Sequence, residues 1–250
     1  MILIDVGNTN LNFAWERKGQ FIKTKRIPTD KANKKNIEEV FSKYPKEKIL
    51  ICSVVPSVTK IFKSLKRKVY IAGEDIKIPI RCFYNKKEVG MDRLVCAFAA
   101  SKIFHRARLI IDFGTAITFD FLSKKGDYQG GLILPGIGST LKVLSRCALL
   151  PEKIELKKTK EFSSKASRLK VEIPKDTKRS IAKGVEEGFS SMVNSLVEKY
   201  KRILHLRPKE TIIITGGEAS FVAAQLNFSC IYEPLLVLRG LLILGNEISS

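Results

Sequence analysis

The chain has 250 residues, 44% of them apolar, which is enough for one large domain or two modest ones with a buried core. The formal net charge of +20 favours anionic partners, but the basic runs carry no interleaved aromatic residues and no zinc-finger or RNA-recognition signature. Five widely spaced cysteines without a C-x-x-C pair, and only two histidines, argue against a disulfide framework or a zinc site. We therefore interpret the basic runs as a solvated surface and expect no nucleic-acid partner.

Two apolar segments of the chain, residues 1–4 and 235–244, give no membrane signal. Met1 to Ile4 are followed at once by the polar stretch 5–12, unlike a signal peptide. Residues 235–244 are interrupted by Arg239 and are far fewer than the about 20 residues of a membrane span. We interpret this late segment as a core or interface helix, and we expect a soluble cytoplasmic protein without a membrane partner.

The first predicted element is a buried strand that ends at Asp5 and leads into the glycine turn 7–9. From Leu11 to Trp15 apolar residues then recur at every second position, which is typical of a second strand, and a turn follows at residues 17–19. The chain therefore begins with a β-hairpin whose tip comes directly after an aspartate.

The next elements are a strand at residues 49–52 and a helix that starts near Gly90. Asp92 and Arg93 lie in the first turn of that helix. Asp92 can simply stabilise the helix through its macrodipole. It can equally accept a hydroxyl proton during phosphoryl transfer, while Arg93 binds an anionic group. The residues alone leave both interpretations open.

A second hairpin repeats the first. A strand ends at Asp112, the turn Gly114-Thr115 follows, apolar residues alternate over 117–121, and a turn comes at 124–126. The aspartate, the glycine and the later turn lysine and glycine keep their offsets, although the alternating residues slip by one position. The matched pair indicates two related halves, residues 1–107 and 108–250.

The remaining elements complete an α/β pattern. Residues 130–136 read as a strand between glycine turns, and residues 189–203 carry apolar positions at helical spacing. A strand at 211–215 runs into Gly216 and Gly217. We therefore expect an α/β fold with mixed sheets in two halves.

Glycine turns of this kind allow backbone N–H groups to approach a phosphate closely. Asn8, Thr9 and Thr115 can add side-chain donors. Asp5 and Asp112 would repel phosphate unless a cation intervenes, so the pair indicates metal-bridged ATP, although one such aspartate could simply cap its turn. A strand follows each turn instead of a helix, so neither a Rossmann turn nor a Walker A loop fits.

Together these residues resemble the type III pantothenate kinase family, within the actin/hexokinase-like superfamily. The resemblance spans nearly the whole chain and rests on the order and spacing of several segments. They are 5–10, 90–93, 112–116, 128–131 with Pro135 and Gly136, Thr177 with Ser180 and Gly184, and 215–217.

The resemblance implies two related actin-like (ribonuclease H-like) halves around an interdomain ATP cleft. It also implies a phosphotransferase that phosphorylates pantothenate to 4′-phosphopantothenate, the first step of coenzyme A biosynthesis. ATP, Mg²⁺ and a monovalent cation, K⁺ or NH₄⁺, are the implied cofactors, and a homodimer is the implied working form.

The resemblance also assigns residues. Asp92 would be the catalytic base, Asp5 would lie near Mg²⁺, and Asp112 would bind the monovalent cation. The ATP phosphates would be held by Asp5, Val6, Gly7, Asn8, Thr9, Asn10, Leu11, Asn12 and Thr115. Pantothenate would be bound by Phe83, Gly90, Met91, Asp92, Arg93 and Thr177, the last from the neighbouring subunit.

Two positions depart from the family pattern. Phe83 stands where the family commonly has tyrosine, with Tyr84 next to it, and Asp176 stands where an asparagine usually precedes the substrate threonine. The alternatives are a sugar kinase or polyphosphate-type phosphohydrolase of the same superfamily, and a nucleic-acid-binding protein that kept the fold. Asp92, Arg93 and Thr177 favour the pantothenate kinase over the first, and intact acids at Asp5, Asp92 and Asp112 favour it over the second.

Overall fold

The computed structural model describes residues 1–85, 87–147, 151, 154–156, 158 and 173–247. The chain forms two compact units. Unit 1 comprises Met1–Phe104, Lys125–Gly130 and Leu235–Ser250, and unit 2 comprises His105–Lys124 and Gly131–Pro234. In the part of the chain that the structure describes, no helix is both long and apolar enough to cross a membrane.

Unit 1 is built on a five-stranded mixed sheet with the strand order β3-β2-β1-β4-β5. The first three strands are antiparallel, whereas β4 pairs parallel with both β1 and β5. The strands are β1 (Ile2–Val6), β2 (Asn10–Arg17), β3 (Gln20–Pro28), β4 (Ile49–Ser53) and β5 (Val69–Ile71).

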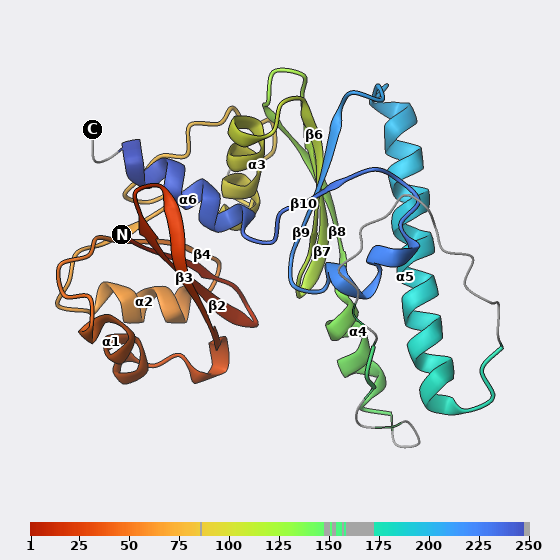
Figure 1. Cartoon of the computed structure of the whole chain (residues 1–250), viewed down its shortest axis with the longest axis horizontal. Coiled ribbons are helices and arrows are strands. Elements are labelled where there is room, and N and C mark those ends of the chain that lie inside the picture. Colours follow the sequence, from red (N-terminus) through yellow and green to blue (C-terminus); the bar gives the residue numbers. More distant parts are fainter. Residues whose placement is uncertain (86, 148–150, 152–153, 157, 159–172, 248–250) are drawn as a thin grey trace. The chain divides into compact units, whose positions relative to one another are not determined.

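Helices cover both faces of this sheet (Figure 1). On one face, apolar residues of α1 and α2 pack against Phe13 and Trp15 of β2. On the other face, α6 packs against β1, β4 and α3. The elements are η1 (Thr29–Lys31), α1 (Lys34–Ser42), α2 (Pro56–Lys63), α3 (Met91–Ile103) and α6 (Leu236–Glu247).

Unit 2 contains a second five-stranded sheet with the order β10-β9-β6-β7-β8. The core of this unit includes Phe113 and Phe119 of the sheet and Val193 of the long helix α5. The strands are β6 (Ala107–Phe113), β7 (Ala116–Leu122), β8 (Tyr128–Pro135), β9 (Thr211–Thr215) and β10 (Ile231–Tyr232). The helices are α4 (Ile137–Leu144), α5 (Thr177–Ile203), η2 (Ala219–Phe221) and η3 (Ala223–Gln225).

The two sheets have the same topology. If β6 is matched to β1, then β7, β8, β9 and β10 fall in the places of β2, β3, β4 and β5. This common order confirms the prediction of an α/β chain with two related halves and mixed sheets. It also agrees with the internal repeat, because β1 and β6 carry Asp5 and Asp112, and each strand ends one residue later than the sequence predicts.

The register explains why the repeat slips by one position. Val6 pairs with Leu11 in the first hairpin, whereas Phe113 pairs with Ile117 in the second. The first turn is therefore one residue longer than the second, and every apolar residue of β2 is displaced accordingly.

A buried ion pair links the starts of β6 and β9 in unit 2. The Arg108 guanidinium contacts the Glu210 carboxylate, and both side chains are less than one-tenth exposed. The Arg108 Nε also donates to the Leu122 carbonyl at 2.8 Å, and the Arg207 N–H donates to Glu210 at 2.6 Å. Burial alone would raise the pKa of Glu210, but these hydrogen bonds and the charges of Arg108 and Lys124 hold it below its ordinary value.

We predict that Glu210→Gln lowers the free energy of unfolding by about 3 kcal/mol or more, because it leaves the Arg108 charge buried without its counter-ion. Urea denaturation at neutral pH measures this change. Glu198→Gln, which removes the carboxylate of an exposed pair with Arg202, is the matched control and should change stability by less than about 1 kcal/mol.

The effect of Glu210→Gln should depend on pH. Because the pKa of Glu210 is lowered on folding, its contribution is complete above the ordinary value of 4.5 and is lost as the pH falls through the folded-state value. The stability difference between wild type and Glu210→Gln should therefore shrink in acid. A difference that stays constant from neutral pH into acid would contradict this account.

Candidate active site

The first turn of unit 1 lies between β1 and β2 and is fixed by backbone hydrogen bonds. The Gly7 N–H donates to the Asn10 carbonyl at 3.0 Å. Thr29 holds the turn from the side, since its hydroxyl donates to the Gly7 carbonyl at 2.7 Å and its N–H donates to the Thr9 carbonyl at 2.9 Å. Asn8 and Thr9 at the tip are exposed. The tip therefore presents polar groups to solvent on a rigid base.

Asp5 is the second-to-last residue of β1, just before this turn. The Asn12 amide donates to the Asp5 carboxylate at 3.0 Å, and the Asn12 oxygen accepts from the Arg26 guanidinium at 2.9 Å. Burial raises the pKa of Asp5 to about 7, the Asp92 charge adds to this effect, and Asn12 and Arg26 oppose it. A carboxylate that is disfavoured in this way is stabilised when a cation binds beside it.

Asp92 lies in the first turn of α3, and one of its oxygens accepts a hydrogen bond from the Arg93 N–H at 2.8 Å. A Cβ at Gly90 would lie 2.5 Å from an Asp92 oxygen, so glycine leaves room for the carboxylate. The Asp92 charge raises the pKa values of both Asp5 and Cys52. The structure thus brings Asp5 and Asp92 together within unit 1, at the end of β1 and the start of α3.

Cys52 pairs with Asp5 across β1 and β4 and is fully buried. Burial raises its pKa well above the ordinary value, so this side chain stays a neutral thiol. Cys96 is also buried. Both cysteines are therefore free thiols in the core of unit 1.

Arg93 is nearly buried and lies beside a pair of tyrosine rings that contact each other edge to face. Its guanidinium carbon is 5.9 Å from the ring centroids of both Tyr84 and Tyr128, which are themselves 6.3 Å apart. Phe83, in contrast, is 56% exposed, and the Arg81 guanidinium carbon lies 4.6 Å from its ring. The tyrosine next to the predicted position, Tyr84, therefore takes the inner place beside Arg93.

Gly130 has a φ of +103°, and a Cβ there would lie 3.0 Å from the Tyr84 ring. The bare glycine backbone thus allows Tyr84 to pack closely. The sequence analysis did not include Tyr84 or Tyr128 among the site residues. Two signals were available: Tyr84 stands one position after the place where the family commonly has tyrosine, and two glycines come shortly after Tyr128.

The second turn lies in unit 2, between β6 and β7. The Gly114 N–H donates to the Ala116 carbonyl at 3.1 Å. The Thr115 carbonyl accepts from the Gly136 N–H at 3.1 Å and from the Ser139 hydroxyl at 2.7 Å. A Cβ at Gly136 would overlap the Gly114 and Thr115 carbonyl oxygens. The start of α4 therefore rests directly on this turn, while the Thr115 residue stays exposed.

Asp112 is the second-to-last residue of β6, as Asp5 is of β1. Gly216, with a φ of +91°, approaches it so closely that a Cβ there would overlap an Asp112 oxygen and the Phe113 carbonyl. The Glu218 N–H donates to that same Phe113 carbonyl at 3.0 Å. The glycines after β9 therefore complete the surroundings of Asp112 within unit 2.

Glu218 is a residue that the sequence analysis missed. Its carboxylate accepts from the Gly138 N–H at 3.1 and 3.2 Å and from the Ile137 N–H, so it caps the start of α4. Burial raises the pKa of Glu218, although these hydrogen bonds and Lys142 oppose the rise. Glu218 thereby fastens the turn after β9 to the helix that rests on Thr115. A glutamate directly after two glycines was the available signal.

Thr177 is the first residue of α5 and is exposed. Asp176 is the N-cap of this helix: its carboxylate accepts from the Arg179 N–H at 3.0 Å and lies 3.4 Å from the Arg179 guanidinium. The aspartate that departs from the family pattern therefore has a structural role, since it satisfies a helix N–H and is partly balanced by a nearby cation.

Over the described ranges, no group of three or more histidine, cysteine, aspartate and glutamate side chains is arranged to hold a metal ion by itself. A cation at Asp5 or Asp112 would need oxygen atoms from a bound phosphate, from the backbone or from water. Mg²⁺ commonly binds in this way, through one or two carboxylates together with substrate phosphates.

Comparison with known proteins places this geometry in a family. The type III pantothenate kinase family model matches residues 1–199. A type III pantothenate kinase from Methylacidiphilum infernorum is 32% identical over 98% of this chain and 88% of its own length. Another from Sulfurihydrogenibium sp. is 32% identical over 98% of both chains.

Solved structures show the same fold at lower identity. A Baf family chain from Campylobacter jejuni matches with a TM-score of 0.61 and 23% identity, over 100% of this chain and 99% of that one. The activator of the 2-hydroxyisocaproyl-CoA dehydratase from Clostridium difficile, solved with ADPNP, matches with a TM-score of 0.58 and 14% identity, over 100% and 96%.

The paired sheets and their two acid-led turns define an α/β chain of the actin-like class, the fold shared by sugar kinases and related ATPases. Within that class, the matches along the sequence are decisive. The chain belongs to the type III pantothenate kinase family. The resemblance inferred from the motifs is confirmed, and with it the prediction that this chain is a kinase.

The capping role of Glu218 can be tested directly. We predict that Glu218→Ala speeds amide hydrogen exchange at Ile137 and Gly138 by about tenfold or more, because removing a buried acceptor costs about 1–3 kcal/mol. Glu218→Gln keeps one acceptor oxygen and should give a smaller change. Unaltered protection at these two amides in Glu218→Ala would show that Glu218 does not hold the start of α4.

Proposed function

We propose that this chain transfers the terminal phosphoryl group of ATP to the hydroxyl group of pantothenate, the reaction for which its family is named. The observation that carries the proposal is the pair of acids in unit 1. Asp5 lies beside the first turn, and Asp92 is near enough for its charge to raise the pKa of Asp5. Phosphoryl transfer needs a cation beside the phosphates and a base at the acceptor hydroxyl, and two neighbouring carboxylates can divide these roles.

ATP phosphates would be held at the tip that runs from Asp5 to Asn12, with Thr115 as the contact from the second turn. In support, Asn8, Thr9 and Thr115 are exposed at the ends of hairpins that are fixed at their bases. Asp5 fits Mg²⁺, because burial and the Asp92 charge disfavour its ionised form when no cation is present. When bound, Mg²⁺ neutralises charge on the phosphate oxygens.

Asp92 would accept the proton of the pantothenate hydroxyl, and Arg93 would bind the pantothenate carboxylate. Arg93 packs beside the paired rings of Tyr84 and Tyr128, which restricts its guanidinium and supports a role in binding a planar anionic partner. Gly90 and Met91 would line the same pocket. Phe83 stays a proposed pantothenate contact because of its position in the family pattern. We add Tyr84 to the proposed site because its ring lies beside the Arg93 guanidinium.

In unit 2, Asp112 would bind the monovalent cation, K⁺ or NH₄⁺. The close approach of Gly216 supports this role, since an Asp112 carboxylate oxygen and the Phe113 carbonyl oxygen lie near each other beside its backbone and are the kind of ligand that such a cation takes. The cation would bind through oxygen atoms and would offset the charge of Asp112 next to the phosphate turn.

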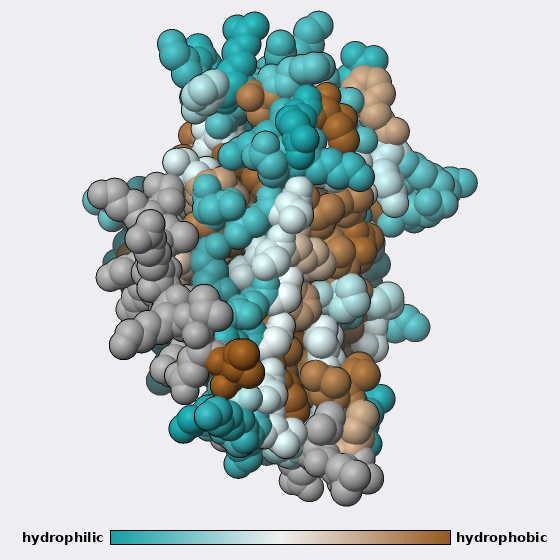
Figure 2. Space-filling view, turned by 90° about the vertical axis from the view of Figure 1, so that its right-hand side faces the viewer, coloured by the Kyte–Doolittle hydropathy of each residue, from teal (hydrophilic) through white to brown (hydrophobic). Residues whose placement is uncertain are grey.

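We propose a homodimer in which Thr177 contacts pantothenate held by the partner. Thr177 begins α5 and is exposed, so it is accessible to a second copy of the chain. Apolar surface on the same helix supports the dimer. Ile203 of α5 is 55% exposed, and brown apolar areas adjoin polar ones on the side of the molecule shown in Figure 2.

The central experiment is an ATP-consumption assay with purified protein, Mg²⁺ and K⁺. We expect ATP to be consumed only when pantothenate is added, because the acceptor hydroxyl completes the reacting pair. Omitting pantothenate or replacing it with a sugar gives the background rate. Consumption that does not depend on pantothenate would point to hydrolysis or to another acceptor.

Substitution of the proposed base should separate catalysis from binding. We predict that Asp92→Asn reduces turnover by about 100-fold or more, the usual scale for a lost general base, while ATP affinity changes little. Asp30→Asn, an exposed acid in η1, is the matched control and should leave turnover unchanged. Near-normal turnover of Asp92→Asn would remove Asp92 from the catalytic role.

A further inference from the structure

A groove with a volume of about 540 Å³ opens in unit 1 between β3 and α1. None of the residues proposed to bind ATP or pantothenate lines it. It is therefore distinct from the site described above, and its own side chains indicate what it can hold.

One face of β3 carries lysines where the neighbouring strand β2 carries aromatic residues. In the register of the sheet, Lys23 pairs with Trp15 and Lys25 pairs with Phe13. Trp15 and Phe13 belong to the core that α1 covers, so the lysine side chains continue the same face beyond the apolar part. One wall of the groove is therefore basic where the neighbouring strand is hydrophobic.

Two further lysines reach the groove from other elements. Lys31 comes from η1 and Lys43 follows the last residue of α1. Among the described residues, Glu39 is the one acidic residue in the lining, so four lysines and one glutamate border the groove. This excess of positive charge favours a multiply charged anion.

The inner wall is apolar. Val40 and Tyr44 line the groove on the α1 side, and Ile27 lines it on the β3 side. Trp15 is 3% exposed, its ring centroid is 5.5 Å from that of Tyr44, and the Lys23 ammonium lies 5.1 Å from its centroid. A ligand that combines charge with an apolar portion would match both walls.

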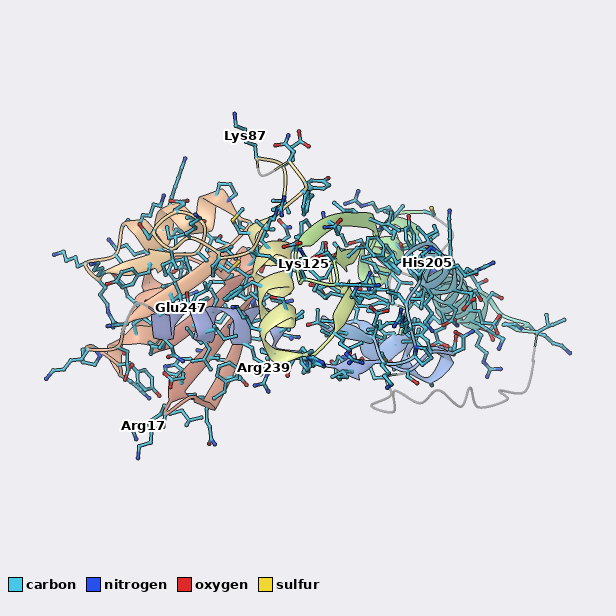
Figure 3. The ribbon with its side chains drawn as sticks, turned by 90° about the horizontal axis from the view of Figure 1, so that it is seen from above. Arg17, Lys87, Lys125, His205, Arg239 and Glu247 are labelled. Atoms are coloured by element: carbon cyan, nitrogen blue, oxygen red, sulfur yellow. The ribbon has the colours of Figure 1, made fainter. Side chains whose placement is uncertain are left out.

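An edge strand often carries lysines that prevent pairing with other chains, and this accounts for Lys23 and Lys25 taken alone. It does not account for Lys31 and Lys43, which belong to other elements and line the same groove. Other cations of unit 1 behave differently: Arg17 and Lys87 extend away from the fold (Figure 3).

We propose that this groove binds a small organic anion that carries two or more phosphate groups and an apolar or ring portion. The phosphates would lie among the four lysines, and the apolar portion would lie against Val40 and Tyr44. The proposal concerns a second binding site and does not depend on the activity at Asp5 and Asp92.

Trp15 is the only tryptophan of the chain, so its fluorescence reports on this groove. The full chain is titrated with inorganic tripolyphosphate, which supplies charge alone, and with adenosine 3′,5′-bisphosphate, which adds a ring. We expect a saturable fluorescence change with both probes. Relative to its number of phosphate groups, adenosine 3′,5′-bisphosphate should bind more tightly than tripolyphosphate.

Single substitutions assign the signal to the groove. Lys25→Glu and Lys43→Glu should each weaken binding by about tenfold or more, and Glu39→Gln should tighten it by about threefold. Lys46→Glu makes the same charge change at an exposed lysine outside the groove and should alter binding less than about twofold. All four variants should retain kinase activity.

Two results would overturn the proposal. One is the absence of a saturable change in the wild-type protein. The other is equal weakening by Lys46→Glu and the groove variants, which would show a diffuse response to net charge. Binding of tripolyphosphate as tight, per phosphate, as that of the bisphosphate would refute the role given to the apolar wall. An absence of pantothenate-dependent ATP consumption in the wild-type protein would contradict the proposed kinase function and would leave the groove proposal unaffected.

Discussion

Both halves of the chain depend on one backbone arrangement, in which a strand ends one residue after an aspartate and returns through a turn that an amide-to-carbonyl hydrogen bond closes. Gly7 donates to Asn10 in the first half, and Gly114 donates to Ala116 in the second. Because the returning strand must stay in register, the turn also determines which polar residue faces each acid. Asn12 lies opposite Asp5 and donates to it. The turn thus sets the electrostatics of the acid as well as the direction of the chain.

The hairpins and the helix α3 could be predicted because their signals are local: period-two alternation, glycine turns and helical spacing. The place of α6 could not. It is the last helix of the chain, yet it packs with α3 and with the first strand of unit 1. Gly240 permits this contact, since a Cβ there would lie 2.6 Å from a Val95 methyl group. A close approach between helices so far apart in sequence leaves no periodic pattern to read.

The site residues divide in the same way. Asp5 and Asp112 come just before recognisable glycine turns and Asp92 lies in the first turn of a helix, so the sequence indicated these proposed site residues. Glu218 and Tyr84 act through tertiary contacts, one with the start of α4 and the other with Arg93. Both departures from the family pattern have a structural explanation. Tyr84 takes the inner position that Phe83 leaves, and Asp176 caps α5, as aspartate does at least as well as asparagine.

The electrostatics of unit 1 explain why acids matter in so basic a chain. Burial and the neighbouring Asp92 charge raise the pKa of Asp5 to about 7, and the Asn12 and Arg26 contributions only partly offset them. The lysines on the surface do not relieve this pair, because solvent screens exposed charges over about 10 Å at 0.1 M salt. Only a proton or a cation at the carboxylates themselves lowers the energy. In the proposed function, a nucleotide that arrives with Mg²⁺ would supply that cation, and the repulsion between the two acids would favour the loaded form of the site over the empty one.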